Sequence, residues 1–215
     1  MAGRSIVPQT HLVKSPFELP EPEWTPDRES PVCMECQDDF SFFKRRHHCR
    51  RCGRLCCSDC TEKKLAIPRM CFLDPVRHCD ACAKVTSKEN YFYNKDLKTL
   101  IQGASLCWEA GCDEDQVLHQ CRLSMDHQNL FVDRCGSGAL LIPMHQIITT
   151  MITSTYNNCH TFQVQYVSVE GGEEKSLRVP MTNNAPVSTI NFVSALQRAV
   201  TMMQEARADI DAKEF

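Results

Sequence analysis

This sequence lacks long apolar runs and familiar catalytic signatures. Its longest uninterrupted apolar stretches, such as residues 139–142, are far shorter than the roughly 18 residues that span a bilayer. The first twenty residues carry no apolar core of the signal-peptide kind. No Walker loop, G-x-S-x-G or H-E-x-x-H motif occurs. We therefore expect a non-enzymatic protein of the cytosol or nucleus, without a transmembrane helix.

Glycine and proline are also scarce. Eight glycines and eleven prolines in 215 residues exclude a collagen-like or low-complexity chain. The hydrophobic share of 42% with 24% charged residues is typical of a globular protein, and the length leaves room for two small domains.

Cysteine, in contrast, is abundant and concentrated. Ten of the fifteen cysteines lie between Cys33 and Cys82. An odd number of cysteines cannot all be paired, and a reducing compartment does not maintain a disulfide framework. Crowded cysteines in such a protein more often bind metal.

Eight of these cysteines form four C-x-x-C pairs, which predict two structural zinc ions with no open position for catalysis. The second and third pairs are only four residues apart, too close to complete one compact site comfortably. We therefore expect the first pair to join the third and the second to join the fourth. The predicted ligand sets are Cys33, Cys36, Cys57 and Cys60 for the first zinc, and Cys49, Cys52, Cys79 and Cys82 for the second.

Two cysteines in this window fall outside the pairs. We expect Cys56 and Cys71 to be buried thiols. Because Cys56 precedes the predicted ligand Cys57, it could replace it, and this alternative stays open at the sequence level.

Positive charge is concentrated in the same region. The whole chain has a net charge of −3, yet six Lys or Arg residues lie in the eleven positions from Lys44 to Arg54. They surround Cys49 and Cys52, so the predicted metal sites would hold their backbone in place. This cluster predicts an anionic partner.

The chain divides into four segments by composition. We predict a mobile leader (1–22), a zinc finger (23–84), a linker or short helix (85–102) and a strand-rich domain (103–215). Short β-like runs in the last segment occupy residues 106–109, 117–124, 129–133, 139–142, 147–152, 161–169 and 176–181. An amphipathic helix follows, with Ile190, Val193, Leu196, Val200 and Met203 spaced by three or four residues.

Seven strands followed by one helix resemble the order of a pleckstrin-homology-like barrel. Many such barrels bind phosphoinositides through a basic loop between their first two strands. The corresponding segment here, residues 110–115, is acidic. We therefore predict a protein-docking or self-associating domain with no strong phosphoinositide site in that loop.

The cysteine-rich segment resembles the FYVE zinc-finger family over residues 23–82. The family's W-x-x-D signature is present from Trp24 to Asp27. Its R-(R/K)-H-H-C-R-x-C-G core runs from Arg45 to Gly53. Its R-V-C signature is Arg77-His78-Cys79, with histidine in place of the usual valine.

The resemblance implies a small α+β cross-brace finger that recognises phosphatidylinositol 3-phosphate on early endosomes. It assigns phosphate contacts to Arg45, Arg46, Arg50 and Arg77, shared phosphate and hydroxyl contacts to His47 and His48, and inositol selectivity to Asp27. Phe42 and Phe43 match the family's membrane-inserting loop, whereas Phe40 and Trp24 are expected to pack. The resemblance also implies a role in endosomal signalling and cell-adhesion turnover, and a place at cell junctions or focal adhesions. It further implies protein partners for the C-terminal domain and a homodimer.

A RING-like ubiquitin ligase is the main alternative, because it uses the same arrangement of two zinc ions. It commonly has a mixed Cys/His ligand set, whereas all four pairs here are C-x-x-C. Nucleic-acid binding is not expected, because the basic run is compact and lies beside an apolar segment.

Overall fold

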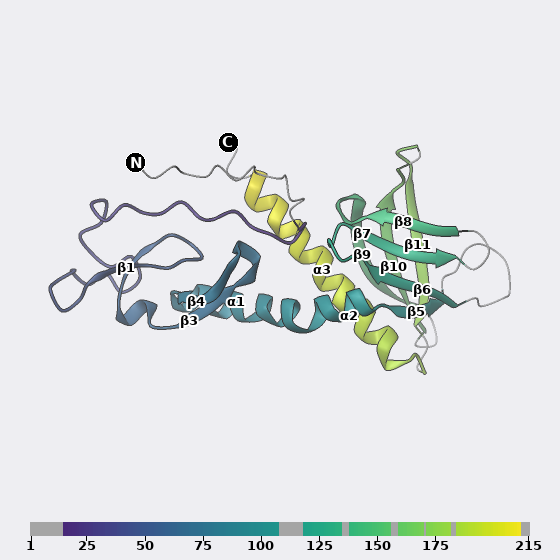
Figure 1. The fold of residues 1–215 in the computed structure, drawn as a ribbon, viewed down its shortest axis with the longest axis horizontal. Coiled ribbons are helices and arrows are strands. Elements are labelled where there is room, and N and C mark those ends of the chain that lie inside the picture. Colours follow the sequence, from purple (N-terminus) through teal and green to yellow (C-terminus); the bar gives the residue numbers. More distant parts are fainter. Residues whose placement is uncertain are drawn as a thin grey trace, which may run out of the picture.

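The computed structural model describes residues 15–107, 118–134, 138–155, 159–169, 171–181 and 184–211. The molecule is elongated, with a cysteine-rich part at one end, a sheet-rich part at the other and helix α3 running between them (Figure 1). Within these ranges, no helix combines the length and apolar character needed to cross a bilayer.

Two short antiparallel hairpins form the cysteine-rich part. β1 (Arg46–His48) pairs with β2 (Leu55–Cys57), and β3 (Lys64–Ile67) pairs with β4 (Phe72–Arg77). The 3-10 turns η1 (Asp59–Thr61) and η2 (Pro68–Met70) follow β2 and β3. Such short strands enclose little apolar volume. Cysteine side chains fill much of the buried centre instead.

One continuous helical stretch leads from the last cysteine pair into the C-terminal half. It consists of α1 (Asp80–Tyr91), a π-helical turn η3 (Phe92–Asp96) and α2 (Leu97–Gln102). The stretch ends at Gly103, whose φ is +79° and whose added Cβ would lie 2.5 Å from the Cys121 carbonyl oxygen. A side chain there would be strained and would clash.

In the described part of the C-terminal half, seven antiparallel strands form two sheets. The first has the order β5 (Ala104–Cys107), β6 (Leu118–Leu123), β7 (Asn129–Arg134) and β8 (Gly138–Pro143). In the second, β10 (Cys159–Val167) lies between β9 (Ile147–Thr155) and β11 (Glu174–Met181), and η4 (Met144–Gln146) connects the sheets. The strands follow the predicted order; predicted positions 108, 109 and 117 lie outside the described residues.

Helix α3 (Val187–Asp211) packs against both sheets. The alternation predicted for Phe162, Val164 and Tyr166 is confirmed, because all three side chains are buried in the main core. The helix contributes Val193, Leu196, Val200 and Met203, as predicted, and also Phe192. The assignment of Ile190 to the core was wrong, since its side chain is 45% exposed. The buried stripe begins at Thr189 instead.

The two sheets cross each other without joining into a closed barrel. Strands of one sheet run across those of the other (Figure 1), and no hydrogen-bonded pairing links the sheets among the strands described. The structure therefore establishes a sheet-rich domain with one C-terminal helix, and the pleckstrin-homology-like barrel stays a prediction. The acidic segment 110–115 lies outside the described residues.

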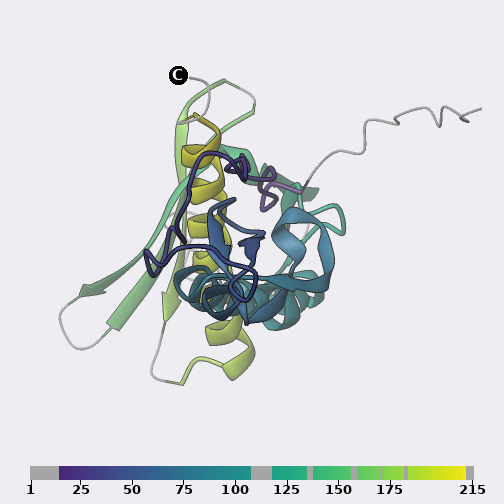
Figure 2. The same ribbon diagram turned by 90° about the vertical axis from the view of Figure 1, so that its left-hand side faces the viewer.

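The segment 15–22 differs from the predicted mobile leader; residues 1–14 lie outside the described part. Phe17 is fully buried, with its ring centroid 5.0 Å from that of Phe92. Leu19 is buried with Ile67 of the finger and Ala206 of α3. Viewed from the cysteine-rich end, α3 stands beside the finger (Figure 2). The apolar residues of this segment are thus anchored between the two halves. The sequence does not predict this role, because it shows only isolated apolar residues among prolines.

Replacing Phe17 with alanine tests this anchor. Loss of a fully buried ring and the resulting cavity should lower the free energy of unfolding by about 3–5 kcal/mol, measured by urea denaturation. Phe43→Ala is the matched control, because the Phe43 side chain is 90% exposed and its removal should leave stability within about 0.5 kcal/mol. Equal stability of the two variants would contradict the anchor.

Candidate functional site

The four C-x-x-C pairs converge into two groups of four sulfur atoms. Within each group, all the sulfur atoms lie within 4.8 Å of one another. A tetrahedral zinc ion with Zn–S distances of about 2.3 Å places its sulfurs about 3.8 Å apart. The donor chemistry and spacing therefore suit structural zinc. The groups are Cys33, Cys36, Cys57 and Cys60, and Cys49, Cys52, Cys79 and Cys82.

The pairs are interleaved along the chain, in the arrangement predicted from their spacing. The β1–β2 hairpin carries ligands of both groups, since Cys49 follows β1 and Cys57 ends β2. Burial raises the pKa of the Cys33 thiol, but backbone N–H groups of Cys36, Glu35 and Cys57 outweigh it and lower the pKa to about 6. At Cys33, the backbone thus favours a thiolate, the form that binds metal.

The two remaining cysteines of this region have different environments. Cys56 is fully buried and belongs to neither group. Burial raises the pKa of its thiol to about 12, and its exclusion as a ligand rests on geometry, because its sulfur lies in neither four-sulfur group. Cys71 is exposed, at φ +60° after η2, so the prediction that it is buried was wrong.

His78, where the family signature usually has valine, is fully buried and bonded on both ring nitrogens. Its Nδ1 lies 2.7 Å from the Val76 carbonyl oxygen and its Nε2 lies 3.1 Å from the Thr86 hydroxyl. Because a carbonyl can only accept, Nδ1 donates, and in the neutral ring Nε2 then accepts from the Thr86 hydroxyl. The substitution thus ties β4 to α1 and leaves Arg77 and Cys79 in place.

The segment Trp24–Asp27 lies against the basic motif because of Gly53. The Thr25 N–H donates to the Gly53 carbonyl at 3.0 Å. A Cβ added to Gly53, which has φ +73°, would lie 1.9 Å from the Glu23 carbonyl oxygen. Only glycine allows this approach. It brings Trp24 within 5.2 Å of the His48 ring, measured between centroids.

The predicted phosphate-contacting arginines come from neighbouring segments. Arg46 lies on β1 and Arg77 at the end of β4, and the Arg50 N–H donates to the Arg77 carbonyl at 2.8 Å. Arg50 stacks its guanidinium carbon 4.2 Å from the Trp24 ring centroid, and Arg46 lies 4.6 Å from that of Phe40. Phe40 and Trp24 thus pack against cations, consistent with the packing predicted for them.

The arginines of the finger fall into two electrostatic classes. Arg51 and Arg69 pair with Glu89, and Arg54 pairs with Glu35. Among the described residues, Arg45, Arg46, Arg50 and Arg77 have no carboxylate partner within 4.0 Å. The unpaired class contains all four residues assigned to phosphate from the sequence, and also Arg28, which follows Asp27. Their charge is available to an external anion.

The two histidines of the motif have different surroundings. His48 donates from Nε2 to the Thr25 carbonyl at 2.7 Å, and the same nitrogen lies 3.7 Å from an Asp27 carboxylate oxygen. Burial, with further contributions from Arg77 and other neighbouring cations, lowers the pKa of His47. At neutral pH, the positive charge around His47 therefore comes from the arginines.

Phe42 and Phe43 occupy the tip of a tight turn. The Ser41 N–H donates to the Lys44 carbonyl, and the Lys44 N–H donates to the Ser41 hydroxyl, both at 3.1 Å. The two rings are 75% and 90% exposed. They contact each other edge to face, with centroids 5.4 Å apart, and the Arg45 guanidinium carbon lies 5.4 Å from the Phe42 ring centroid. The structure thus places an apolar tip directly beside the basic strand.

Sequence reasoning missed the ion pair that closes this turn. The Lys44 ammonium bonds to the Asp38 carboxylate, and this contact lowers the pKa of Asp38. No motif marks the pair, because the two residues are six positions apart in an irregular segment.

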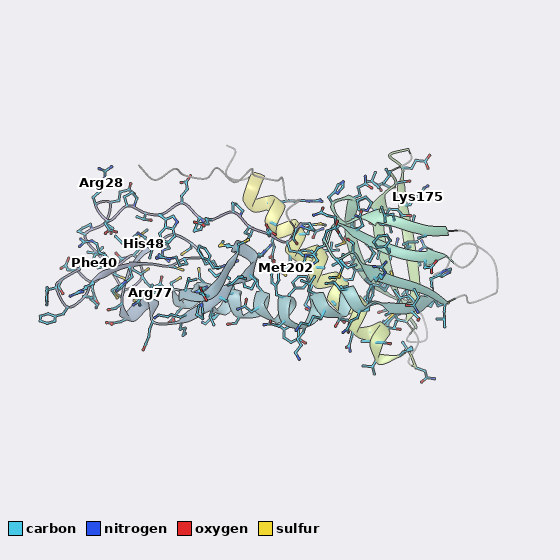
Figure 3. All side chains as sticks on the ribbon, in the orientation of Figure 1. Arg28, Phe40, His48, Arg77, Lys175 and Met202 are labelled. Atoms are coloured by element: carbon cyan, nitrogen blue, oxygen red, sulfur yellow. The ribbon has the colours of Figure 1, made fainter. Side chains whose placement is uncertain are left out.

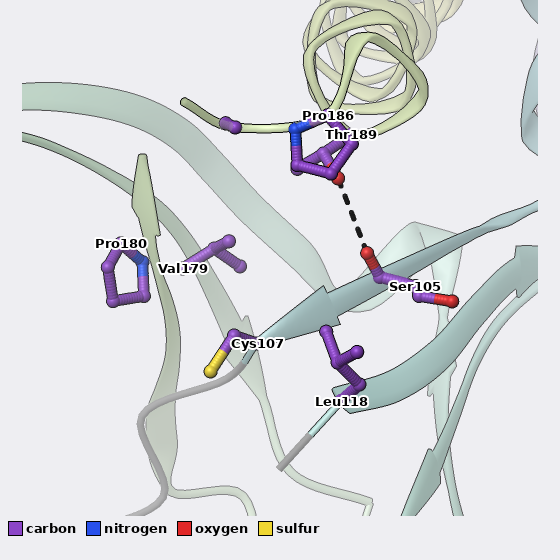
Figure 4. A pocket seen from close by; sticks show the side chains of 8 residues that line it. Ser105, Cys107, Leu118, Val179, Pro180, Pro186 and Thr189 are labelled. Atoms are coloured by element: carbon purple, nitrogen blue, oxygen red, sulfur yellow. Dashed lines mark hydrogen bonds between the residues drawn. The ribbon is translucent and has the colours of Figure 1, made fainter. Parts of the chain in front are cut away.

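A pocket in the C-terminal half offers no comparable chemistry. It has a volume of about 170 Å³ and lies between the N-terminal end of α3, β5 and β11, where Thr189 bonds to the Ser105 carbonyl (Figure 4). Its only titratable lining group is the Cys107 thiol. The thiolate centres and the basic surface therefore form the candidate functional site.

Comparison with protein families divides the chain into two matched regions. Residues 23–88 match the FYVE zinc finger family. Residues 91–208 match the family described as "Zinc finger FYVE domain-containing protein 21 C-terminus". The junction between them falls in the continuous helix that begins at Asp80.

Similarity to individual proteins concerns the finger. Human zinc finger FYVE domain-containing protein 26 is 46% identical over 68 residues, which are 31% of this chain and 3% of that protein. Pleckstrin homology domain-containing family F member 2 of Danio rerio is 45% identical over 75 residues, 34% of this chain and 30% of that protein. The chain thus matches less than a third of these relatives' length. None of the matches named here is a RING-type ligase.

Two solved structures are similar to the same region. The LM5-1 FYVE domain from Leishmania major is 40% identical and covers 30% of this chain and 77% of its own, with a TM-score of 0.29. The VHS and FYVE tandem domains of Hrs, a protein involved in membrane trafficking and signal transduction, are 33% identical and cover 34% of this chain and 31% of their own, also with a TM-score of 0.29. The family match and the two four-sulfur groups together establish a finger that binds two zinc ions.

Adjacent cysteines allow a sharp test of the ligand sets. Cys57→Ser removes one sulfur of the first group and should lower the zinc content from two ions per chain to about one. Cys56→Ser is the matched control and should keep two. Inductively coupled plasma mass spectrometry on protein of known concentration measures both. Loss of zinc from the Cys56 variant alone would mean that the assignment is reversed.

Proposed function

Because the chain belongs to the family of zinc finger FYVE domain-containing protein 21, we propose that it is an adaptor that binds membranes containing phosphatidylinositol 3-phosphate. The two zinc ions have a structural role and hold the basic strand in shape. FYVE fingers generally bind this lipid in membrane trafficking, so the proposed location is the cytosolic face of early endosomes.

One observation carries this proposal: the division of the arginines into paired and unpaired classes. Arg45, Arg46, Arg50 and Arg77 lack carboxylate partners in the described part of the chain, whereas Arg51, Arg54 and Arg69 have them. Four unpaired guanidinium groups repel one another unless an anion neutralises them. Guanidinium groups bind phosphate oxygens in bidentate geometry, so a phosphorylated headgroup is the fitting ligand.

Asp27 and the two histidines would complete the headgroup site. The Asp27 side chain is 68% exposed and lies on the same side as His48. A carboxylate accepts hydrogen bonds from inositol hydroxyls but repels an additional phosphate. This arrangement favours a ring with a single phosphate besides the one that links it to the lipid. His47 and His48 would share contacts with phosphate and hydroxyl oxygens.

Phe42 and Phe43 would enter the membrane beside the bound headgroup. Their exposure, 75% and 90%, is unfavourable in water. Burying each ring in the interfacial region would contribute roughly 1.5–3 kcal/mol. The closing pair of Asp38 and Lys44 would keep the turn in shape while it inserts.

The C-terminal half is proposed to be a pleckstrin-homology-like docking domain for protein partners. This rests on its strand order and on the acidic character of segment 110–115 in the sequence. The same proposal includes a non-catalytic adaptor role in endosomal signalling and cell-adhesion turnover. It also includes a second location at focal adhesions and self-association into a homodimer.

Arg50→Gln tests the headgroup site. Loss of one charge-assisted contact should weaken binding to vesicles doped with phosphatidylinositol 3-phosphate by roughly tenfold or more, measured by co-sedimentation. Arg54→Gln is the control, because Arg54 is already paired with Glu35. Vesicles with phosphatidylinositol 4-phosphate should bind neither protein strongly. Equal weakening by both substitutions would point to nonspecific charge attraction.

Replacing Phe42 and Phe43 together with alanine tests insertion. The double variant should lose more than about 100-fold in vesicle affinity, since two interfacial rings are removed. It should still bind the soluble headgroup, inositol 1,3-bisphosphate, as the unchanged protein does. Met125→Ala, in the C-terminal half and 74% exposed, is the control. Unchanged vesicle binding by the double variant would exclude insertion.

A further inference from the structure

Arg69, outside the basic motif, is the largest fully buried side chain described, with 1% of its surface exposed. It lies on η2, at the turn between β3 and β4 of the finger. Its Nε donates to the Phe17 carbonyl at 2.9 Å, and its NH1 donates to the Glu89 carboxylate at 2.6 Å. One guanidinium thus joins the finger to the N-terminal segment and to α1.

The same guanidinium also reaches α3 of the C-terminal half. Its NH2 donates to the Met202 carbonyl, and its NH1 lies 3.2 Å from a Glu205 carboxylate oxygen. Figure 3 places Met202 between the finger and the sheets. Arg69 therefore has partners in three segments outside its own hairpin, through four contacts of its guanidinium.

Apolar contacts surround this polar junction. Ala206 of α3 is 3% exposed and packs with Leu19, Ile67 and Met70. The charges are balanced, because Arg51 also binds Glu89, at 2.5 and 2.8 Å. Two cations thus meet two carboxylates. If the finger and α3 separated, Arg69 would lose its α3 partners and the apolar patch would be exposed.

We infer that Arg69 locks the zinc finger and the C-terminal sheets into one rigid body. The orientation in which the finger binds a membrane then fixes the direction in which the sheets point. The continuous helix from Asp80 to Gln102 gives a second connection between the halves. The Arg198 pair with Asp96, at 2.5 Å, joins α3 to that helix. Arg69 is a positioning residue and does not contact the lipid.

The rigid body has a consequence for the membrane, which rests on the proposed function. Phe40, near the inserting turn, lies at one end of the long axis, and Lys175 lies toward the other end (Figure 3). A finger inserted by its tip would therefore hold the C-terminal sheets away from the bilayer. Their surface would be presented to partners in solution, at a fixed orientation.

A matched pair of substitutions on α3 tests the lock. Ala206→Arg introduces a large cation into the buried junction, whereas Ala208→Arg introduces it at an exposed position two residues away. Arg69→Met, which keeps the size of the side chain but removes its donors, tests the finger side. Glu89 keeps Arg51 as a partner in that variant. Zinc content of the full chain reports whether each finger still folds.

Two readouts on the full-length protein decide the outcome. Energy transfer between fluorescent non-natural residues at exposed positions 28 and 175 should show a narrow distance distribution in the parent and the Ala208 variant. It should broaden in the Ala206 and Arg69 variants. Amide hydrogen exchange in residues 202–207 should accelerate by about tenfold or more in those two. Unchanged distances and exchange in zinc-replete Ala206→Arg and Arg69→Met would overturn the lock.

Vesicle co-sedimentation separates this inference from the proposed function. Ala206→Arg should still bind vesicles containing phosphatidylinositol 3-phosphate, because it leaves the basic surface intact. Failure of the parent protein to bind such vesicles would refute the lipid proposal and leave the lock to be judged by distance and exchange alone.

Discussion

Coordination of eight cysteine sulfurs is the constraint on which the finger depends. Its strands are three to six residues long, and a domain of this size buries too little apolar surface to be safely stable alone. Structural zinc supplies binding free energy that becomes folding free energy. The same constraint shapes the basic surface: Cys49 and Cys52 flank Arg50 and share a metal group with Cys79, two residues after Arg77, so the metal site keeps repelling cations adjacent.

The basic surface shows how a folded domain can maintain uncompensated charge. Arg51 and Arg69 form ion pairs with the buried carboxylate of Glu89, and Arg54 forms one with Glu35. Aromatic rings rather than carboxylates support Arg46 and Arg50. A ring face stabilises a cation without neutralising it. Paired arginines and those proposed to bind the headgroup thus differ in the kind of neighbour each has, although they alternate in the sequence.

Short-range patterns in the sequence predicted much of this protein, and long-range contacts could not be predicted. The C-x-x-C spacing gave the interleaved metal groups, and the period-two pattern of Phe162, Val164 and Tyr166 gave a core strand. Phe17 and Arg69 carried no such signal, because their partners lie in segments far along the chain. Ile190 shares the spacing of the helix core, yet it is exposed because the face of α3 toward the sheets is occupied there by Thr189 and Phe192. Cys71 was misassigned because burial of a lone thiol depends on tertiary packing alone.

The π-helical turn from Phe92 to Asp96 lies in the helix that joins the two halves. Each residue of an α-helix turns the chain by about 100° and advances it by about 1.5 Å, and a π turn accommodates one extra residue within a helix. Deleting one residue there would rotate everything beyond it by more than a quarter of a revolution. Buried Phe92 and Asp96 would then lose their places against Phe17 and Arg198. The number of residues in this helix therefore determines how one half is rotated about the helix axis relative to the other. Point substitutions leave this rotation unchanged, whereas insertions and deletions alter it.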